Sequence, residues 1–341
     1  MINRQYPTTQ ERSESKPMKK RIKKFSSNVI LFFCFILIFF YCKTLSYSNE
    51  TAAEIAASGI IFKEEKNISI EKEDLYISQD RVEVSYVFKN HSSEDIKTII
   101  AFPVPDYDYD LTATGNQASW RDFHDFTVEV DGQKTAYQVE ARALFNGKDY
   151  SQLINAMGIS IKDYGEGDRL KHNTFHGLFN KLSEENKKRL IDLGLVLFDN
   201  GVAFPTWKVS LKYYWKQTFP ANSTVSIRHT YKPNNGYDVF ADKYYKDACI
   251  TKEVAQWIRN STYYIRVRYV KYILVTANNW KQPIKDFHLI VEEPSLQDNP
   301  EGWRISICFE NELTKTSNNH FEFTIKNYIP QKDVAVYLFY R

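Results

Sequence analysis

The stretch from Trp207 to Tyr231 alternates between two kinds of side chain, and no other feature constrains the fold as strongly. Odd positions are almost all apolar and even positions are mostly basic or hydroxylic, with a Pro-Ala-Asn-Ser turn between the two halves. Successive side chains of a strand point to opposite faces, so a period of two indicates a strand with one buried face. The stretch predicts two long strands whose aromatic rings and His229 lie in a core.

The even positions of the same stretch form a cationic face. We expect most of these side chains to be solvated, because charged residues are rarely buried without a partner. One alternative remains open, a shallow patch that meets an anionic partner. Its members would be Lys208, Lys212, Tyr214, Lys216, Arg228 and Lys232.

Strand patterns dominate the rest of the chain, in keeping with an aromatic content of 15%. The run "DRVEVSYVFKN" alternates, and "DFTVEVDGQKTAYQVEARA" predicts a hairpin with Asp131-Gly132 at its turn. We also predict one or two helical turns between Asn49 and Gly59, and a strand over residues 263–276.

Helical spacing replaces strand spacing over residues 148–200, where Ser183 has the character of an N-cap and Gly194 of a helix stop. A second, short helix is expected near residues 251–260. The predicted fold is mainly β, an antiparallel β-sandwich with a helical insertion. The predicted organisation is a signal peptide or N-terminal membrane anchor (1–48), an N-terminal β region (49–147), the helical insertion (148–200) and a C-terminal β region (201–341).

Charge is distributed unevenly along the chain. The first 48 residues carry nine Lys/Arg and two Asp/Glu, and the remainder carries 36 and 40, so the formal net charge of +3 hides an acidic domain. Such a domain lacks the basic surface of a general nucleic-acid binder. We therefore expect no nucleic-acid partner.

The basic leader precedes an apolar run, Val29–Cys42, whose 14 residues fall short of the roughly 20 that a spanning helix needs. Ser46 and Ser48 place small residues before Asn49, as a signal peptide cleavage site requires. This pattern predicts export with cleavage near Ser48/Asn49, with an uncleaved anchor at residues 29–42 as the alternative. Either way the domain would be extracytoplasmic, in the periplasm or cell envelope. Membrane contact is expected only through an uncleaved N-terminal segment.

Two of the four cysteines, Cys249 and Cys308, lie in the exported part of the chain. Two cysteines in an oxidising compartment most often pair, so a disulfide is expected. Two buried thiols or one reactive thiol are the alternatives.

Three further stretches carry a family resemblance: "EKEDLYISQDRVEVSYVFKN" with "IIAFPVPD", then "YYWKQTFPANSTVSIRHTYKP", and finally "YILVTANNWKQPIKDFHLIVE". In this order and spacing they resemble domain of unknown function family 4424, a family of exported bacterial proteins, from about Asn49 to the C-terminus. The resemblance implies an exported β-rich protein, and Cys249 and Cys308 match its two C-terminal cysteine positions. It implies no activity.

Metal and catalytic patterns are weak. His172 and His176 have the i, i+4 spacing of helical zinc ligands but lack the accompanying glutamate. Asp106, Asp108 and Asp110 do not fit an EF-hand loop, since Leu111 stands where glycine is needed. We expect no metal site, no cofactor and no catalytic residue.

His124, among acidic residues in "WRDFHDF", is the best candidate for acid-base chemistry. An envelope hydrolase with a site near His124 and Asp106–Asp110 is therefore one alternative function. Another is a glycan-binding module that uses Trp280, Asn278, Asn279 and Tyr214, because sugars stack on exposed rings. The leading hypothesis is a non-enzymatic β-sandwich module that binds an envelope protein or glycan.

Overall fold

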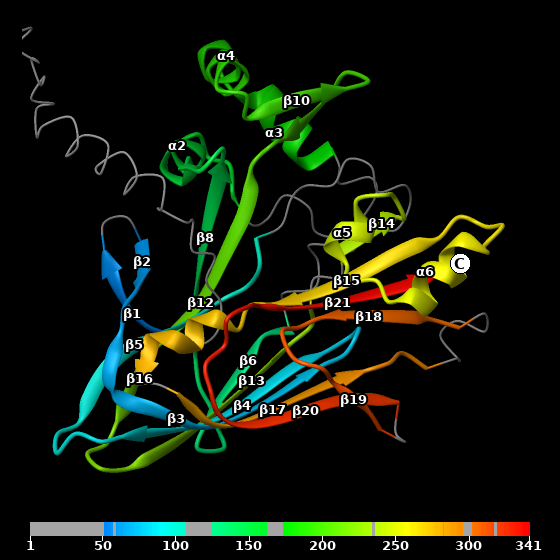
Figure 1. Ribbon diagram of the computed structural model, residues 1–341. Helices are drawn as coiled ribbons and strands as arrows, with labels where there is room; N and C mark the ends of the chain where they lie inside the picture. Colours follow the sequence, from blue (N-terminus) through cyan, green and yellow to red (C-terminus); the bar gives the residue numbers. More distant parts are fainter. Residues whose placement is uncertain are drawn as a thin grey trace, which may run out of the picture. The chain divides into compact units, whose positions relative to one another are not determined.

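Strands make up most of the structure, a computed structural model that describes residues 51–56, 59–106, 125–161, 173–233, 236–281, 283–295, 302–316 and 319–341. Within these ranges the strands form four sheets, and most neighbouring strands run antiparallel (Figure 1). The predicted mainly-β, sandwich-like architecture is confirmed.

One sheet has six strands in the order β2-β1-β5-β12-β8-β9. Its strands are β1 (Thr51–Ala56), β2 (Gly59–Phe62), β5 (Ile96–Pro103), β8 (Gln138–Phe145), β9 (Lys148–Asp149) and β12 (Lys208–Phe219).

The largest sheet has the order β19-β20-β17-β3-β4-β13-β6-β7, and β16 pairs with β3 beside β17. The strands β16 and β17 run parallel to β3. The Asp131-Gly132 turn connects β6 to β7 as predicted, with both residues at positive φ. The bounds are β3 (Glu65–Ile77), β4 (Val82–Asn90), β6 (Thr127–Val130), β7 (Gln133–Lys134), β13 (Thr224–Tyr231), β16 (Trp280–Lys281), β17 (Ile284–Glu292), β19 (Thr314–Lys315) and β20 (His320–Tyr328).

A four-stranded sheet, in the order β14-β15-β21-β18, has both faces covered. Val270, Val336 and Leu338 point into the main core, whereas Val267 and Phe339 pack under two helices with Tyr244 and Ile258. The elements are β14 (Gly236–Val239), β15 (Arg266–Tyr272), β18 (Arg304–Cys308), β21 (Val334–Tyr340), α5 (Tyr244–Asp247) and α6 (Lys252–Arg259). The predicted short helix is α6, and Thr251 is its N-cap.

The two strands of the alternating stretch belong to different sheets, so the turn between them is a corner and not a hairpin. β12 pairs with β5 and β8, and β13 pairs with β4 and β6. The odd positions of both strands are buried, as predicted, and the two inner faces meet in one core. His229 is fully buried there, and its ring centroid lies 4.2 Å from that of Phe102.

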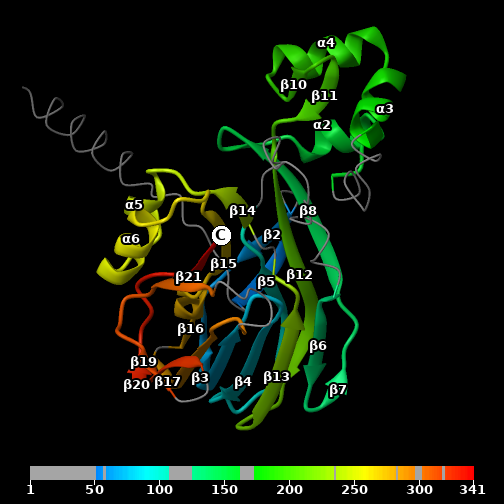
Figure 2. The same ribbon diagram turned by 90° about the vertical axis from the view of Figure 1, so that its right-hand side faces the viewer.

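Helices cluster where predicted, within residues 148–200, at the ends of the long strands β8 and β12 (Figure 2). The Ser183 hydroxyl accepts a hydrogen bond from the Asn186 amide at 3.3 Å, which confirms the predicted cap. None of the described helices has the length and apolar character needed to cross a membrane. The elements are α2 (Ser151–Ala156), α3 (Asn173–Lys181), α4 (Glu184–Asp192), β10 (Val196–Asp199) and β11 (Val202–Pro205).

Two predictions were wrong. Residues 51–56 and 59–62 form the antiparallel strands β1 and β2 and not helical turns, because pairing of β1 with β5 buries Ala52 and Ala53 and outweighs helix propensity. The strand expected over residues 263–276 is β15 alone. It ends early because the Asp333 carboxylate accepts hydrogen bonds from the amides of Leu274 and Val275, which starts the 3₁₀ helix η3 (Val275–Asn279).

Candidate binding surfaces

Trp280, the stacking residue of the alternative glycan-binding hypothesis, lies in the core. Its side chain is 3% exposed, and its ring centroid lies 4.9 Å from that of Phe88 and 6.1 Å from that of Phe219. The indole therefore has no open face for a sugar. This placement follows from the turn before it, because η3 delivers Trp280 directly onto β3.

The amides of the same turn also serve the fold. Asn278 donates to the Pro330 carbonyl at 2.8 Å, and Asn279 donates to the hydroxyl of the buried Thr51 at 2.9 Å. These bonds join the turn to β1 and to the segment before β21. The two asparagines thus hold Trp280 in place, and their Nδ2 donors are engaged within the protein.

Tyr214 is half-buried because the hairpin β1–β2 contacts the outer face of β12. Tyr214 packs against the small apolar cluster that contains Ile60. The backbone amide and carbonyl of Ile60 are each bound by one member of an ion pair. Glu140 accepts a hydrogen bond from the Ile60 amide at 2.9 Å, and Lys212 donates to its carbonyl at 2.8 Å. The two charged side chains lie 3.2 Å apart. Part of the predicted cationic patch is therefore used to attach the hairpin.

His176 and its neighbours hold the helical region together. The Ala203 amide donates to His176 Nδ1 at 3.0 Å, and Asn180 contacts Nε2 at 2.8 Å. Both ring nitrogens are thus engaged. Among the described residues no group of His, Cys, Asp and Glu has the geometry of a metal site.

Several predicted residues lie outside the described ranges, namely His124, His172, Asp108 and Asp110. The hydrolase hypothesis depends on His124 and Asp106–Asp110, so it stays a prediction. The apolar run 29–42 and the cleavage site near Ser48/Asn49 also fall outside these ranges.

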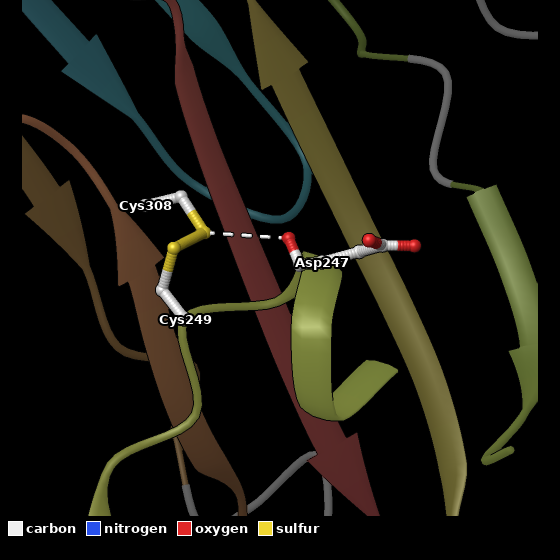
Figure 3. The surroundings of a disulfide bond; sticks show 3 residues. All are labelled: Asp247, Cys249 and Cys308. Atoms are coloured by element: carbon white, nitrogen blue, oxygen red, sulfur yellow. Dashed lines mark hydrogen bonds between the residues drawn. A yellow bond between two sulfur atoms is a disulfide. The ribbon is translucent and has the colours of Figure 1, made fainter. Parts of the chain in front are cut away.

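The disulfide between Cys249 and Cys308 is present (Figure 3). It joins the segment between α5 and α6 to the end of β18, with the Cα atoms 5.3 Å apart. The Cys308 sulfur also lies 3.5 Å from the Asp247 carbonyl oxygen. A disulfide sulfur has no proton to donate, so this is a weak polar contact. A disulfide is consistent with an oxidising compartment.

A polar cluster that sequence periodicity does not predict lies where β3 has a bulge. The register of β3 against β4 shifts between Ile70 and Lys72, which leaves Glu71 unpaired. Ser69, just before the bulge, pairs with Lys89 on β4 and with Lys281 on β16. We refer to one group of residues as the bulge cluster: Ser69, Glu71, Lys89, His91, Lys281 and Lys285.

The donor and the acceptor of each hydrogen bond in this cluster can be assigned. Ser69 Oγ lies 2.7 Å from Glu71 Oε1 and 2.7 Å from His91 Nε2, and Lys285 donates to Glu71 Oε2 at 2.8 Å. A carboxylate only accepts, so the Ser69 hydroxyl donates to Glu71 and His91 Nε2–H donates to Ser69. In a catalytic triad the carboxylate binds the histidine and the free Nε2 accepts the serine proton. The observed arrangement is the reverse and does not activate Ser69.

Two pKa values in the cluster are lowered. The hydrogen bond from Lys285 lowers the pKa of Glu71 against the opposing effect of burial, so Glu71 is ionised. Burial lowers the pKa of His91, and the charges of Lys281 and Lys89 lower it further. The imidazole is therefore neutral at pH 7, and the cluster carries three lysines against one glutamate.

Among the described residues, the most exposed large hydrophobic side chains are two consecutive tyrosines, Tyr263 and Tyr264, at 67% and 85%. Their loop is fixed from both ends. The Ser261 hydroxyl binds the Tyr263 backbone on both its amide and its carbonyl, and the Phe240 amide donates to the Ile265 carbonyl at 2.8 Å.

Two more exposed residues, Val239 and Tyr245, adjoin this loop, since Phe240 follows Val239 and its ring lies 5.2 Å from that of Tyr245. We call the group of Val239, Tyr245, Tyr263 and Tyr264 the tyrosine patch. Tyr263 and Tyr264 precede β15, so they lie outside its alternation and strand periodicity does not predict the patch.

The edge of the sheet beside the tyrosine patch is blocked. β14 is an edge strand, and the Asp238 side chain accepts a hydrogen bond from the next amide, that of Val239, at 2.7 Å. Lys243 and Tyr244 bind the same carboxylate. Burial raises the pKa of Asp238, but these hydrogen bonds outweigh burial and the net pKa is lowered. A partner that added a strand would have to displace an ionised group.

Comparisons with solved structures give distant matches. A Legionella pneumophila protein that is provisionally described as nutrient binding is 16% identical, with 85% of this chain and 70% of that chain covered and a TM-score of 0.41. Yeast LTA4 hydrolase in complex with bestatin is 10% identical, with 87% and 31% covered and a TM-score of 0.32. An M1 zinc metallopeptidase from Deinococcus radiodurans is 8% identical, with 81% and 43% covered and a TM-score of 0.28.

The chain spans less than half the length of the yeast hydrolase and of the Deinococcus metallopeptidase. Likenesses this weak carry no argument about function. No curated protein matches the sequence. One family model, described as a domain of unknown function, matches residues 48–337 and confirms the predicted resemblance. Because the match covers most of the sequence, this chain belongs to the DUF4424 family.

Proposed function

We propose that this protein is an extracytoplasmic binding module, without catalytic activity of its own, that contacts a protein partner through the tyrosine patch. The observation that carries the proposal is the exposure of Tyr263 and Tyr264 on a loop with a fixed backbone. Tyrosine supplies a large contact area at a low cost in conformational entropy and is enriched at binding hot spots.

A protein partner fits this surface better than a glycan does. The patch adds the apolar side chain of Val239 to its three tyrosines, and consecutive residues such as Tyr263 and Tyr264 do not present one flat platform. Because the edge of β14 is blocked, the partner would contact the side chains of the patch and would not add a strand to the sheet.

An extracytoplasmic location is part of the proposal. The basic leader and apolar run support it, as does the disulfide. N-terminal sequencing of the exported protein tests this part: a start at Asn49 supports cleavage, and an intact leader supports the anchor at residues 29–42.

Photo-crosslinking in the source cells tests the contact surface. A benzoyl-phenylalanine placed at position 264 should give one discrete adduct, and Tyr263→Ser should remove that adduct. The same probe at position 329, an exposed isoleucine outside the patch, is the matched control.

An adduct of equal yield from position 329 would contradict the proposal. A glycosidase-sensitive smear would show that the partner is a glycan and not a protein. An adduct of two copies of this chain would show that the patch mediates self-association.

The hydrolase hypothesis makes a separate prediction. If a site near His124 and Asp106–Asp110 exists, purified protein should hydrolyse an ester, amide or glycoside substrate, and His124→Ala should abolish turnover. Retention of turnover in that variant would count against it.

A further inference from the structure

We propose that the bulge cluster is a second binding site, separate from the tyrosine patch, that takes a tetrahedral oxyanion of the phosphate class. The anion would lie over Ser69, between the ammonium groups of Lys89 and Lys281 and beside His91. This site needs no partner protein and no contribution from the tyrosine patch, so each proposal can fail without the other.

The register of the sheet brings the two lysines together. Ser69 pairs with Lys89 on one side and with Lys281 on the other, and directly paired residues of neighbouring strands share a face. Neighbouring strands are about 5 Å apart, so both lysine side chains start about 5 Å from Ser69 on the same face. A small anion can contact both at once.

These two lysines differ from others on the same sheet face. Lys72 is paired with Asp74 at 2.7 Å, Lys326 with Asp286 at 3.8 Å, and Lys285 with Glu71. Among the described residues neither Lys89 nor Lys281 has an acidic partner within 4.0 Å. Their strands lie about 10 Å apart on either side of Ser69, so an anion over Ser69 would be attracted by both charges.

The bulge holds the other members in place. Glu71 is held by both Lys285 and Ser69, so its carboxylate is fixed beside the Ser69 hydroxyl and is neutralised in part by Lys285. His91 is fixed by its bond to Ser69 and by its backbone amide, which donates to the Asn67 carbonyl at 2.9 Å. Ser69, Glu71 and His91, the base of the site, are therefore in place before the anion binds, which lowers the entropy cost of binding.

His91 supplies a reporter. The groups that face it are Glu71 on β3, Lys89 on β4, Lys281 on β16 and Lys285 on β17, and in sum they disfavour the imidazolium. An anion held by Lys89 and Lys281 would offset their charge and raise the pKa of His91. By linkage, the affinity for the anion should rise as the pH falls toward the pKa of His91.

The test is an NMR titration of the His91 imidazole in the whole exported domain at constant ionic strength. Inorganic phosphate and sulfate are the probes, and sulfate keeps its charge over the pH range, so its pH dependence reports on His91 alone. We expect saturable shifts and a higher pKa of His91 with either anion.

Lys281→Ala and Lys89→Ala should each weaken binding about tenfold, the effect of losing one charged hydrogen bond. Lys326→Ala, on the same face but paired with Asp286, is the matched control and should bind as the unaltered protein does. Thermal unfolding of each variant shows that the fold is retained, which is expected because Lys281 is exposed and Lys89 half-exposed.

Shifts that never saturate, or equal binding in all three variants, would overturn the site. Acetate binding as tightly as phosphate would overturn the assignment to tetrahedral oxyanions. Glycerol phosphate, as a phosphomonoester, distinguishes the two sources of the ligand. Tighter binding than inorganic phosphate supports an esterified phosphate, and weaker binding supports the free ion.

Discussion

The turn Asn278–Trp280 and the loop Ser261–Tyr264 have similar sequences and opposite surroundings. Each has small polar residues followed by large aromatic ones, yet Trp280 is buried and Tyr264 is 85% exposed. The difference lies in where the polar groups bond. Asn278 and Asn279 donate to other parts of the fold, whereas the Ser261 hydroxyl bonds within its own loop.

This comparison separates aromatic residues that hold the structure from those available to a partner. A polar group that bonds at long range draws the neighbouring ring into the core. A polar group that bonds locally fixes the loop and leaves its rings in solvent. Composition alone does not distinguish the two cases.

The largest expected effect is on the buried side of the comparison. Trp280→Ala should lower the free energy of unfolding by about 3–5 kcal/mol, because it removes a large ring from a packed core. Tyr264→Ala should change it by less than about 0.5 kcal/mol, as is usual for an exposed position. Urea unfolding of both variants measures this, and equal losses would remove the distinction.

Removal of the disulfide should have the next largest effect. The chain-entropy model gives roughly 4 kcal/mol for the double variant Cys249→Ser/Cys308→Ser, because the bond closes a loop with a sequence separation of 59 residues. Since α5 and α6 are attached through this bond, limited proteolysis of the variant should begin near the tyrosine patch. Cleavage that begins at the Trp280 turn instead would show that the disulfide does not stabilise the patch.

The asparagine bond gives a smaller effect. Asn279→Ala should lower the free energy of unfolding by about 1 kcal/mol, the usual value of one hydrogen bond, because it leaves the buried Thr51 hydroxyl with one partner fewer. Ser261→Ala is the matched change in the exposed loop and should cost less. If Ser261→Ala costs as much, local bonds matter as much as long-range ones, and our explanation of the two stretches fails.

The smallest effect is a pH dependence that only the buried turn should show. Burial raises the pKa of Asp333, whose carboxylate starts η3, despite the hydrogen bonds from Leu274 and Val275. The folded state therefore holds this proton more tightly than the unfolded state does. The contribution of protonated Asp333 to the free energy of unfolding is fully present below the pKa of this group in the unfolded state. It is lost as the pH rises through the pKa of the group in the folded state.

Asp333→Asn should remove this loss, since an amide oxygen still accepts the two bonds and does not ionise. Unfolding measured from pH 3 to pH 7 should show a flatter profile in the variant. An unchanged profile would mean that Asp333 does not titrate between the two states.

Periodicity predicted the buried faces of β12 and β13, the core position of His229 and the cap at Ser183 because these depend on nearby residues. It did not predict that the two strands belong to different sheets, because the corner between them has the sequence of a hairpin turn. The same limit applies to β1, whose strand conformation depends on pairing with β5, about 45 residues away.

The candidate sites were harder to predict for the same reason. Trp280 and Asn279 resembled a binding site because their partners, Phe88 and Thr51, are nearly 200 residues away or more. The bulge cluster brings together residues from four strands and depends on one register shift in β3. Tyr263 and Tyr264 lie in a loop before β15, where no strand period applies, so periodicity could not identify them.

The affinity of the crosslinked partner, once purified, for the Tyr264→Ala variant tests the central claim most directly. We predict a loss of about 30-fold or more, the size of a hot-spot effect, with an unchanged free energy of unfolding. An unchanged affinity, or a loss that matches a loss of stability, would contradict the assignment of the tyrosine patch as the contact surface.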